Sequence, residues 1–129
     1  MQNYTTNIIK KQVTPIHEDA RRSLSEPYNG TFIAKQIKLL KVKEKSVLGN
    51  HFHPFGQFFF FMKGGGYYTF IDVITKEKKN YTAKKGDYIQ IEKNIAHAGL
   101  LRKGTIIIEG NEEKYTGPEC DIKYEVMDE

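Results

Sequence analysis

From residue 31 onward, the sequence is a succession of short β-rich runs separated by turn residues, and helix signals are almost absent. Four consecutive phenylalanines lie within residues 57–62, a run too short for an amphipathic helix and typical of a strand buried on both faces. Three glycines at 64–66 end that run, and a second aromatic and β-branched run follows at residues 67–74. Short strands punctuated in this way predict an all-β sandwich or barrel.

The length of 129 residues suits a single domain that can bury a sizeable core. We expect residues 1–30 to form an N-terminal arm or edge strand that packs on the barrel, because Pro15 and Pro27 limit regular structure there, and residues 31–129 to form the barrel. No apolar run reaches the length of a membrane span, and the polar start lacks the order of a secretory signal, so we expect a cytoplasmic protein. The single cysteine, Cys120, is expected to be structural.

The basic residues are scattered along the chain. The net charge is +4 with a pI near 9.0, but the lysines alternate with acidic residues and are not gathered beside stacking aromatics. A nucleic-acid footprint needs such a gathered face, so we expect no nucleic-acid partner. The same positive charge would favour a small ligand that carries phosphate.

Three of the four histidines lie in two short motifs. His51 and His53 are two residues apart, so on a strand both side chains point to one face of the sheet. His97 follows a Gly-Asp turn at residues 86–87 and a short β-rich run. Neutral imidazoles suit a divalent transition metal, but the same residues could form a metal-free polar cluster. The fourth histidine, His17, lies beside acidic residues outside both motifs, and we expect it to be exposed and structural.

Both histidine motifs resemble those of cupins. Residues 49–64 resemble the first cupin motif, with His51, His53, Gln57 and Gly64 in its order, and residues 86–97 resemble the second, which ends at His97. The resemblance implies the cupin double-stranded β-helix, a jelly-roll barrel. It also implies a metal site of His51, His53, Gln57 and His97, with iron, manganese, nickel, zinc or copper as the candidate ion. Gln57 departs from the motif, because its neutral amide oxygen replaces the usual carboxylate and ligates more weakly.

Two further segments resemble cupins that epimerise or ketoisomerise nucleotide-linked deoxysugars. Residues 19–26 are similar to the D-x-R-G-x-L/F-x-E opening of that family, and residues 48–51 are similar to its Arg-Gly-x-His segment. This resemblance spans about residues 19–109 and implies a nucleotide-sugar substrate, with Arg21 at the diphosphate and His51 as the catalytic histidine. Arg22 and Leu48 replace a motif glycine and arginine, and residues 35–42 lack the tyrosine that the ketoisomerases use. The alternative for residues 19–26 is a charged turn.

The sugar interpretation gives His51 the role of general base beside the sugar's keto group, because imidazole titrates near neutral pH. His53 or a barrel tyrosine would return the proton. We expect Gln57, Tyr68 and Tyr88 to point into the barrel, where they would bind substrate or stabilise the enolate.

The metal interpretation excludes that role, because a nitrogen bonded to a metal cannot also accept a proton. Metal occupancy therefore separates the two mechanisms. A metal-dependent dioxygenase is the alternative enzyme, and a non-catalytic small-molecule-binding cupin is the alternative without chemistry. Because jelly rolls of this size have exposed edge strands, we also expect a homodimer.

Overall fold

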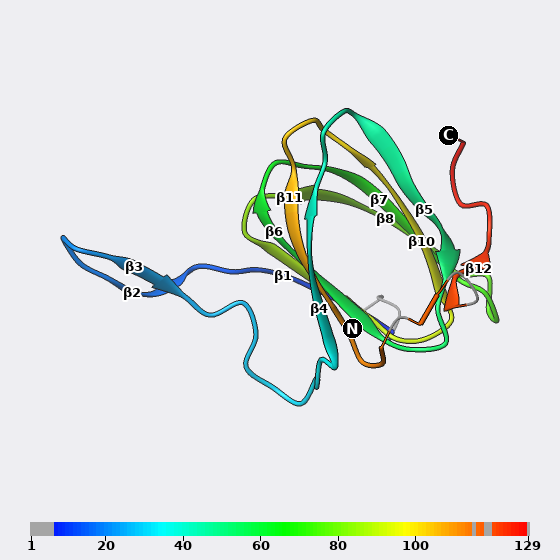
Figure 1. Cartoon of the computed structure of the whole chain (residues 1–129), viewed down its shortest axis with the longest axis horizontal. Helices are drawn as coiled ribbons and strands as arrows, with labels where there is room; N and C mark the ends of the chain where they lie inside the picture. The colour runs from blue at the N-terminus through cyan, green and yellow to red at the C-terminus, as the bar shows by residue number, and fades with distance from the viewer. Residues whose placement is uncertain (1–6, 115, 118–119, 129) are drawn as a thin grey trace.

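A computed structural model describes residues 7–114, 116–117 and 120–128, and its architecture is two five-stranded antiparallel sheets that face each other (Figure 1). The first sheet has the order β1 (Ile8–Gln12), β9 (Asp87–Ile91), β6 (Gln57–Lys63), β11 (Ile106–Asn111) and β4 (Gln36–Lys41). The second has the order β12 (Ile122–Lys123), β5 (Ser46–Phe52), β10 (Ile95–Leu101), β7 (Gly65–Asp72) and β8 (Lys78–Lys84). The described residues contain no helix that is long and apolar enough to cross a membrane. The all-β prediction is confirmed.

The phenylalanine run forms β6 and supplies much of the core. Its burial alternates along the strand, so Phe59 and Phe61 point between the sheets while Phe58 points outward. Phe58 is nevertheless covered, because the rings of Tyr88 and Phe32 pack against it at centroid distances of 5.5 and 5.4 Å. The expected burial on both faces therefore has two sources: the barrel core inside, and outside it Tyr88 of β9 with Phe32 of the segment after the arm.

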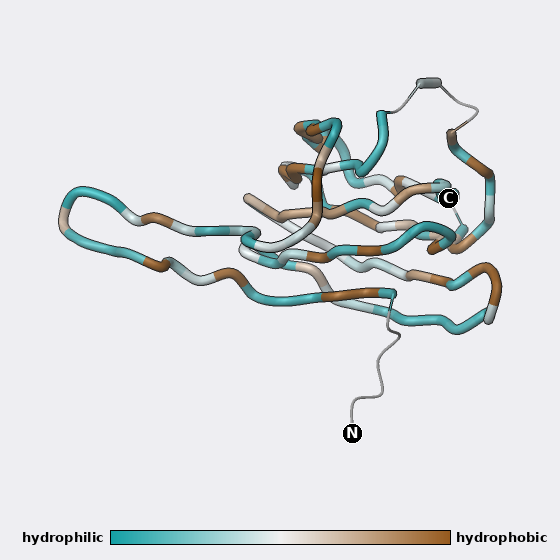
Figure 2. Tube along the Cα trace, turned by 90° about the horizontal axis from the view of Figure 1, so that it is seen from below, coloured by the Kyte–Doolittle hydropathy of each residue, from teal (hydrophilic) through white to brown (hydrophobic). Residues whose placement is uncertain are grey.

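The N-terminal segment leaves the barrel and returns to it. Strand β1 lies at the edge of the first sheet, paired with β9. A separate hairpin of β2 (Pro15–Glu18) and β3 (Ser23–Ser25) then projects away from both sheets, with all seven of its strand residues exposed (Figures 1 and 2). Figure 2 also shows that the hairpin is hydrophilic at its tip. Residues 7–12 thus belong to the barrel, whereas residues 15–25 form an exposed arm.

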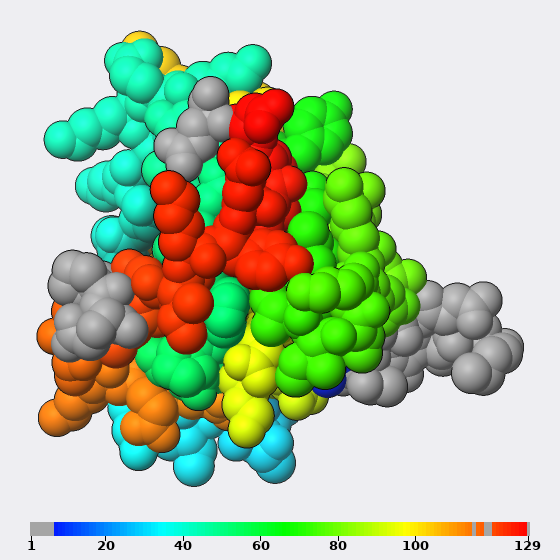
Figure 3. Space-filling view, turned by 90° about the vertical axis from the view of Figure 1, so that its right-hand side faces the viewer, coloured from blue at the N-terminus to red at the C-terminus, as the bar shows by residue number. Residues whose placement is uncertain are grey.

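The C-terminal segment lies across β5, where Figure 3 shows it in red on the face of the barrel. Asn50 is its anchor: its Oδ1 accepts hydrogen bonds from the backbone N–H groups of Val126 and Met127, and its Nδ2 donates to the Met127 carbonyl. The Asn50 carbonyl also accepts a hydrogen bond from the N–H of Tyr124. Together with the pairing of β12 with β5, these bonds hold residues 122–127 beside the strand that carries His51.

Candidate active site and metal centre

The two sheets enclose a cavity of about 400 Å³. This volume lies within the usual range for small-molecule sites. His51, His53 and His97 line it from the second sheet and its flanking loop, and Gln57 lines it from the first. The cavity therefore brings together strands that are far apart in the sequence.

The three histidines form one cluster. Their ligand nitrogens all lie within 4.8 Å of one another. The ring centroid of His51 is 4.6 Å from that of His53 and 4.8 Å from that of His97, and His53 and His97 are 5.6 Å apart. Such spacing fits three imidazoles that converge on a single divalent ion.

A bulge in β5 sets the direction of the first histidine. In the pairing of β5 with β10, Gly49 lies opposite Ala98 and His51 lies opposite His97, so Asn50 is the extra residue. Asn50 has a φ of 59° and Gly49 a φ of 114°. A Cβ on Gly49 would also lie only 2.5 Å from the His97 carbonyl oxygen, so glycine is required where the two strands approach. The bulge turns the strand so that Leu48 and His51, three residues apart, both line the cavity.

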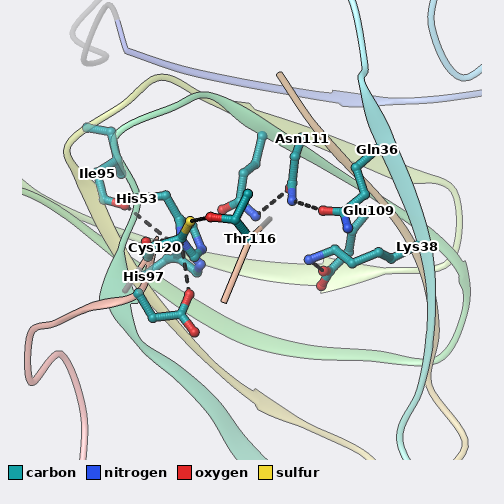
Figure 4. Close-up of polar contacts among 11 residues, drawn as sticks. Gln36, Lys38, His53, Ile95, His97, Glu109, Asn111, Thr116 and Cys120 are labelled. Carbon is teal, nitrogen blue, oxygen red and sulfur yellow. Dashed lines mark hydrogen bonds and ion pairs between the residues drawn. The ribbon is translucent and has the colours of Figure 1, made fainter. Parts of the chain in front are cut away.

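Backbone carbonyls fix the tautomers of two of the histidines. Nδ1 of His53 lies 2.9 Å from the Cys120 carbonyl oxygen, and Nδ1 of His97 lies 3.2 Å from the Ile95 carbonyl oxygen (Figure 4). A carbonyl can only accept, so each Nδ1 carries the proton and each Nε2 keeps a free lone pair. The Asp121 carboxylate, 3.2 Å from His53 Nδ1, supports the same tautomer. Metal-binding histidines are usually oriented in this way.

All three imidazoles are held in the neutral form. Burial, followed by the positive charge of the neighbouring histidines, lowers the pKa of His97 to about 3. Burial also lowers the pKa values of His51 and His53 below the usual range for histidine. A neutral imidazole can bind a metal or accept a proton, so the electrostatics suit both chemistries.

Gln57 supplies the fourth polar group. It is 2% exposed, and its Nε2 donates to Oδ1 of Asn111 at 2.9 Å. Nδ2 of Asn111 donates in turn to Oε1 of Gln36 at 2.7 Å, so three directly opposed residues of β6, β11 and β4 form a row of amides. This row fixes the Gln57 side chain, and its Oε1 is buried without a hydrogen-bond partner among the described residues. An orphaned buried oxygen on a residue that lines the same cavity as three neutral imidazoles fits a metal ligand.

The cavity wall on the first sheet also carries a charged pair that the sequence patterns did not single out. Nζ of Lys38 on β4 lies 3.5 Å from Oε1 of Glu109 on β11, and both side chains line the cavity. The signal was present in residues 36–41, where polar Gln36 and Lys38 alternate with apolar Ile37 and Leu39. The polar residues point inward and the apolar ones are exposed, which inverts the usual pattern.

The structure brings together most of the predicted site residues but not all of them. Tyr68 lines the cavity and is buried, and burial raises the pKa of its hydroxyl. The prediction that Tyr88 points into the barrel is wrong. Tyr88 lies on the outer face of its sheet, stacked between Tyr28 and Phe58, and its hydroxyl donates a hydrogen bond to Oε1 of Gln90. Side chains alternate along β9, so Tyr88 points outward because its neighbour Ile89 lies in the core.

Arg21 also lies outside the cavity of its own chain. It is in the turn of the β2–β3 arm, where its side chain is 85% exposed and its backbone N–H donates to the Asp19 carboxylate. His17, expected to be exposed, lies on the same arm beside Asp19. Within one chain, therefore, Arg21 does not reach the histidine cluster.

No protein-family model matches the sequence, and neither does any curated protein sequence. Several solved structures are similar to it. The dTDP-4-dehydrorhamnose 3,5-epimerase from Bacillus anthracis, solved with TDP and PPi bound, has a TM-score of 0.79 at 18% identity, over 95% of this chain and 81% of that chain. The sugar 3,4-ketoisomerase from Thermoanaerobacterium thermosaccharolyticum, in complex with TDP, has a TM-score of 0.73 at 17% identity, over 92% and 89%.

A TDP-fucose-3,4-ketoisomerase from Campylobacter jejuni is similar at a TM-score of 0.69 and 18% identity, over 90% of this chain and 88% of that chain. The TM-scores of these three structures establish a shared architecture. With two facing antiparallel sheets and inward histidines at both motif positions, the chain has the cupin fold.

Proposed function

We propose that this chain is a metal-binding cupin that isomerises or epimerises a nucleotide-linked sugar. One observation carries the proposal: three neutral imidazoles converge in a cavity of about 400 Å³ that is also lined by Gln57, whose amide oxygen is orphaned. Similarity of the barrel to epimerases and ketoisomerases of TDP-linked sugars supports the substrate class. The scattered positive charge is compatible with a ligand that carries a diphosphate.

The proposed metal ligands are the ring nitrogens of His51, His53 and His97 and Oε1 of Gln57. Iron, manganese, nickel, zinc and copper all accept such a set. All four donors are neutral, so a bound divalent ion would keep its full charge and polarise a carbonyl oxygen of the substrate strongly. The carbonyls of Cys120 and Ile95 would hold His53 and His97 in the orientation that binding needs.

A metal-free mechanism is the second candidate, and the state of His51 favours it. Burial keeps this imidazole neutral, and no hydrogen bond to its ring is found among the described residues. In that case His51 would act as the general base that removes a proton next to the keto group. We place a dioxygenase below both, because non-haem iron oxygenases usually use a carboxylate ligand and this cluster has only histidines.

The proposed role of Arg21 at the diphosphate requires a second copy of the chain, because the arm carries Arg21 away from its own cavity. The homodimer expected from the sequence would supply that copy. The exposed side chains of Ile37 and Leu39 on the outer face of β4, at the edge of the first sheet, give apolar surface that pairing would cover.

Complementation tests this arrangement. Arg21→Ala and His51→Ala should each be inactive alone, and their mixture should recover about a quarter of wild-type activity if Arg21 acts on the partner's cavity. A mixture with no recovery would contradict the proposed role.

The function itself is tested with TDP-4-keto-6-deoxyglucose, the ligand of a structurally similar ketoisomerase. Proton NMR should show conversion by wild-type protein and by Glu113→Gln, an exposed control carboxylate. His51→Ala should show none. Wild-type protein that neither binds nor converts this compound or other TDP-linked keto sugars would contradict the proposal.

A further inference from the structure

The cavity wall opposite the histidines carries an acid and a base whose presence the metal centre does not explain. Figure 4 shows Glu109 and Lys38 together on one side of the cavity and His53 and His97 on the other. Glu109 and Lys38 are directly opposed residues of β11 and β4, so the backbone register itself holds them together. Their side chains are 16% and 38% exposed.

Burying the Glu109 carboxylate lowers the stability of the fold, because its charge loses solvation. Its neighbours along the inward face of β11 are Ile107 and Asn111, both fully buried. Burial raises the pKa of the Glu109 carboxyl above its usual range, and the charge of Lys38 opposes that rise. A glutamine would fill the same space without a charge to desolvate. A carboxyl kept at such a position in a cavity is a candidate for proton transfer.

Lys38 links the pair to the histidine cluster. Its positive charge lowers the pKa values of His51, His53 and His97, so it lies within electrostatic reach of all three. Glu109 acts in the same way on Tyr68, whose pKa its charge raises. A ligand in the cavity would therefore contact the cluster on one side and the Lys38–Glu109 pair on the other.

We propose that Glu109 is a further catalytic residue, which moves a proton between neighbouring carbons of a keto sugar while Lys38 moves a proton between the two oxygens. The proposal rests on the proposed function and deepens it, because it assigns proton transfer to residues that remain available when His51 holds a metal. It also names the substrate class as an α-hydroxy ketone, with ketoisomerisation as the reaction.

The two steps balance. In the first, the Glu109 carboxylate takes the proton from the carbon that bears the hydroxyl group; the C–H electron pair forms the carbon–carbon double bond, and the keto oxygen receives a proton from the Lys38 ammonium. In the second, the Lys38 amine takes the original hydroxyl proton as the new carbonyl forms, and Glu109 returns its proton to the former keto carbon. Both side chains end in their starting states.

The test compares Glu109→Gln and Lys38→Met with the control Glu113→Gln, whose carboxylate pairs with Lys35 on the exterior. Each is incubated with TDP-4-keto-6-deoxyglucose in deuterated buffer and followed by NMR. Glu109→Gln should lose both isomerisation and deuterium incorporation by about a hundredfold or more, with metal content and TDP binding unchanged. Glu109→Asp, which keeps the carboxyl, should recover part of the lost rate. Lys38→Met should lose isomerisation more than exchange.

Glu109→Gln with rates within about threefold of wild type would overturn the role of Glu109 while the proposed function stands. Loss of activity accompanied by loss of metal or of TDP binding would overturn it too, because it would indicate a structural role. If wild-type protein incorporated no deuterium into any TDP-linked keto sugar, the proposed function would be overturned, and the role of Glu109 with it.

Discussion

Replacing Asn50 should loosen the C-terminal segment and, through it, the histidine cluster. Asn50→Gly keeps the backbone at its positive φ but removes the three side-chain hydrogen bonds to Val126 and Met127. At about 1 kcal/mol for each hydrogen bond, opening of this segment should become easier by about 2–3 kcal/mol. Asn50→Ala should add about 1 kcal/mol of strain, because alanine tolerates the left-handed region poorly.

Hydrogen exchange measures this change directly. The protection of the Tyr124, Val126 and Met127 amides should fall by about thirty- to 150-fold in Asn50→Gly, and further in Asn50→Ala. The released segment also carries the Cys120 carbonyl that orients His53, so metal affinity should fall by about tenfold or more.

The control for these variants is Asn94→Gly, at a turn residue whose φ of 67° is also positive. It should leave the protection of the C-terminal amides unchanged. The reasoning would be refuted if Asn50→Gly exchanged these amides at the wild-type rate, or if metal affinity were unaffected after they had lost protection.

Three further changes have definite expected outcomes. Phe61→Ala empties a fully buried position and should lower the free energy of unfolding in urea by about 3–5 kcal/mol; a loss below 1 kcal/mol would contradict the core assignment. In metal-free protein, the pKa of His97 is about 3 in the folded state and near 6.5 in the unfolded chain. The unfolded chain therefore binds this proton first, and the free energy of unfolding should decrease as the pH falls from about 6.5 toward 3. A flat profile over this range would contradict the burial of a neutral His97. Gln57→Glu buries a carboxylate and should lower the melting temperature of metal-free protein, a loss that a divalent metal should reverse; no metal response would argue against Gln57 as a ligand.

The sequence patterns predicted the features that depend on local spacing. His51 and His53 line the same cavity as their two-residue spacing predicted, although His53 follows the last residue of β5. The Gly-Asp turn marked the start of β9, the strand before the one that carries His97. Tyr88 could not be oriented in the same way. Asp87 and Ile89 on either side of it are buried as well, so the strand shows no alternation that would identify an inward face. The ring of Tyr28, which is distant in the sequence, covers Tyr88 on the outer face of the sheet.

The charged pair was missed for a related reason. Lys38 and Glu109 are 71 positions apart in the sequence, and only the β4–β11 register places them together. Residues 36–41 also invert the usual rule, because the polar face is the inner one and Ile37 and Leu39 are exposed. A strand that lines a polar cavity and has an apolar outer face shows the opposite pattern from one that packs on an apolar core. The sequence pattern alone therefore could not show which face of residues 36–41 points inward.

Metal content tests the central claim most directly. Purified protein should be incubated with iron, manganese, nickel, zinc or copper, freed of excess ion, and analysed by elemental mass spectrometry beside His51→Ala, His97→Ala and the exposed control His17→Ala. We expect about one ion per chain in wild-type protein and in His17→Ala, and none in the two cluster variants. Wild-type protein that stays metal-free with all five ions would contradict the metal centre and return His51 to the role of general base.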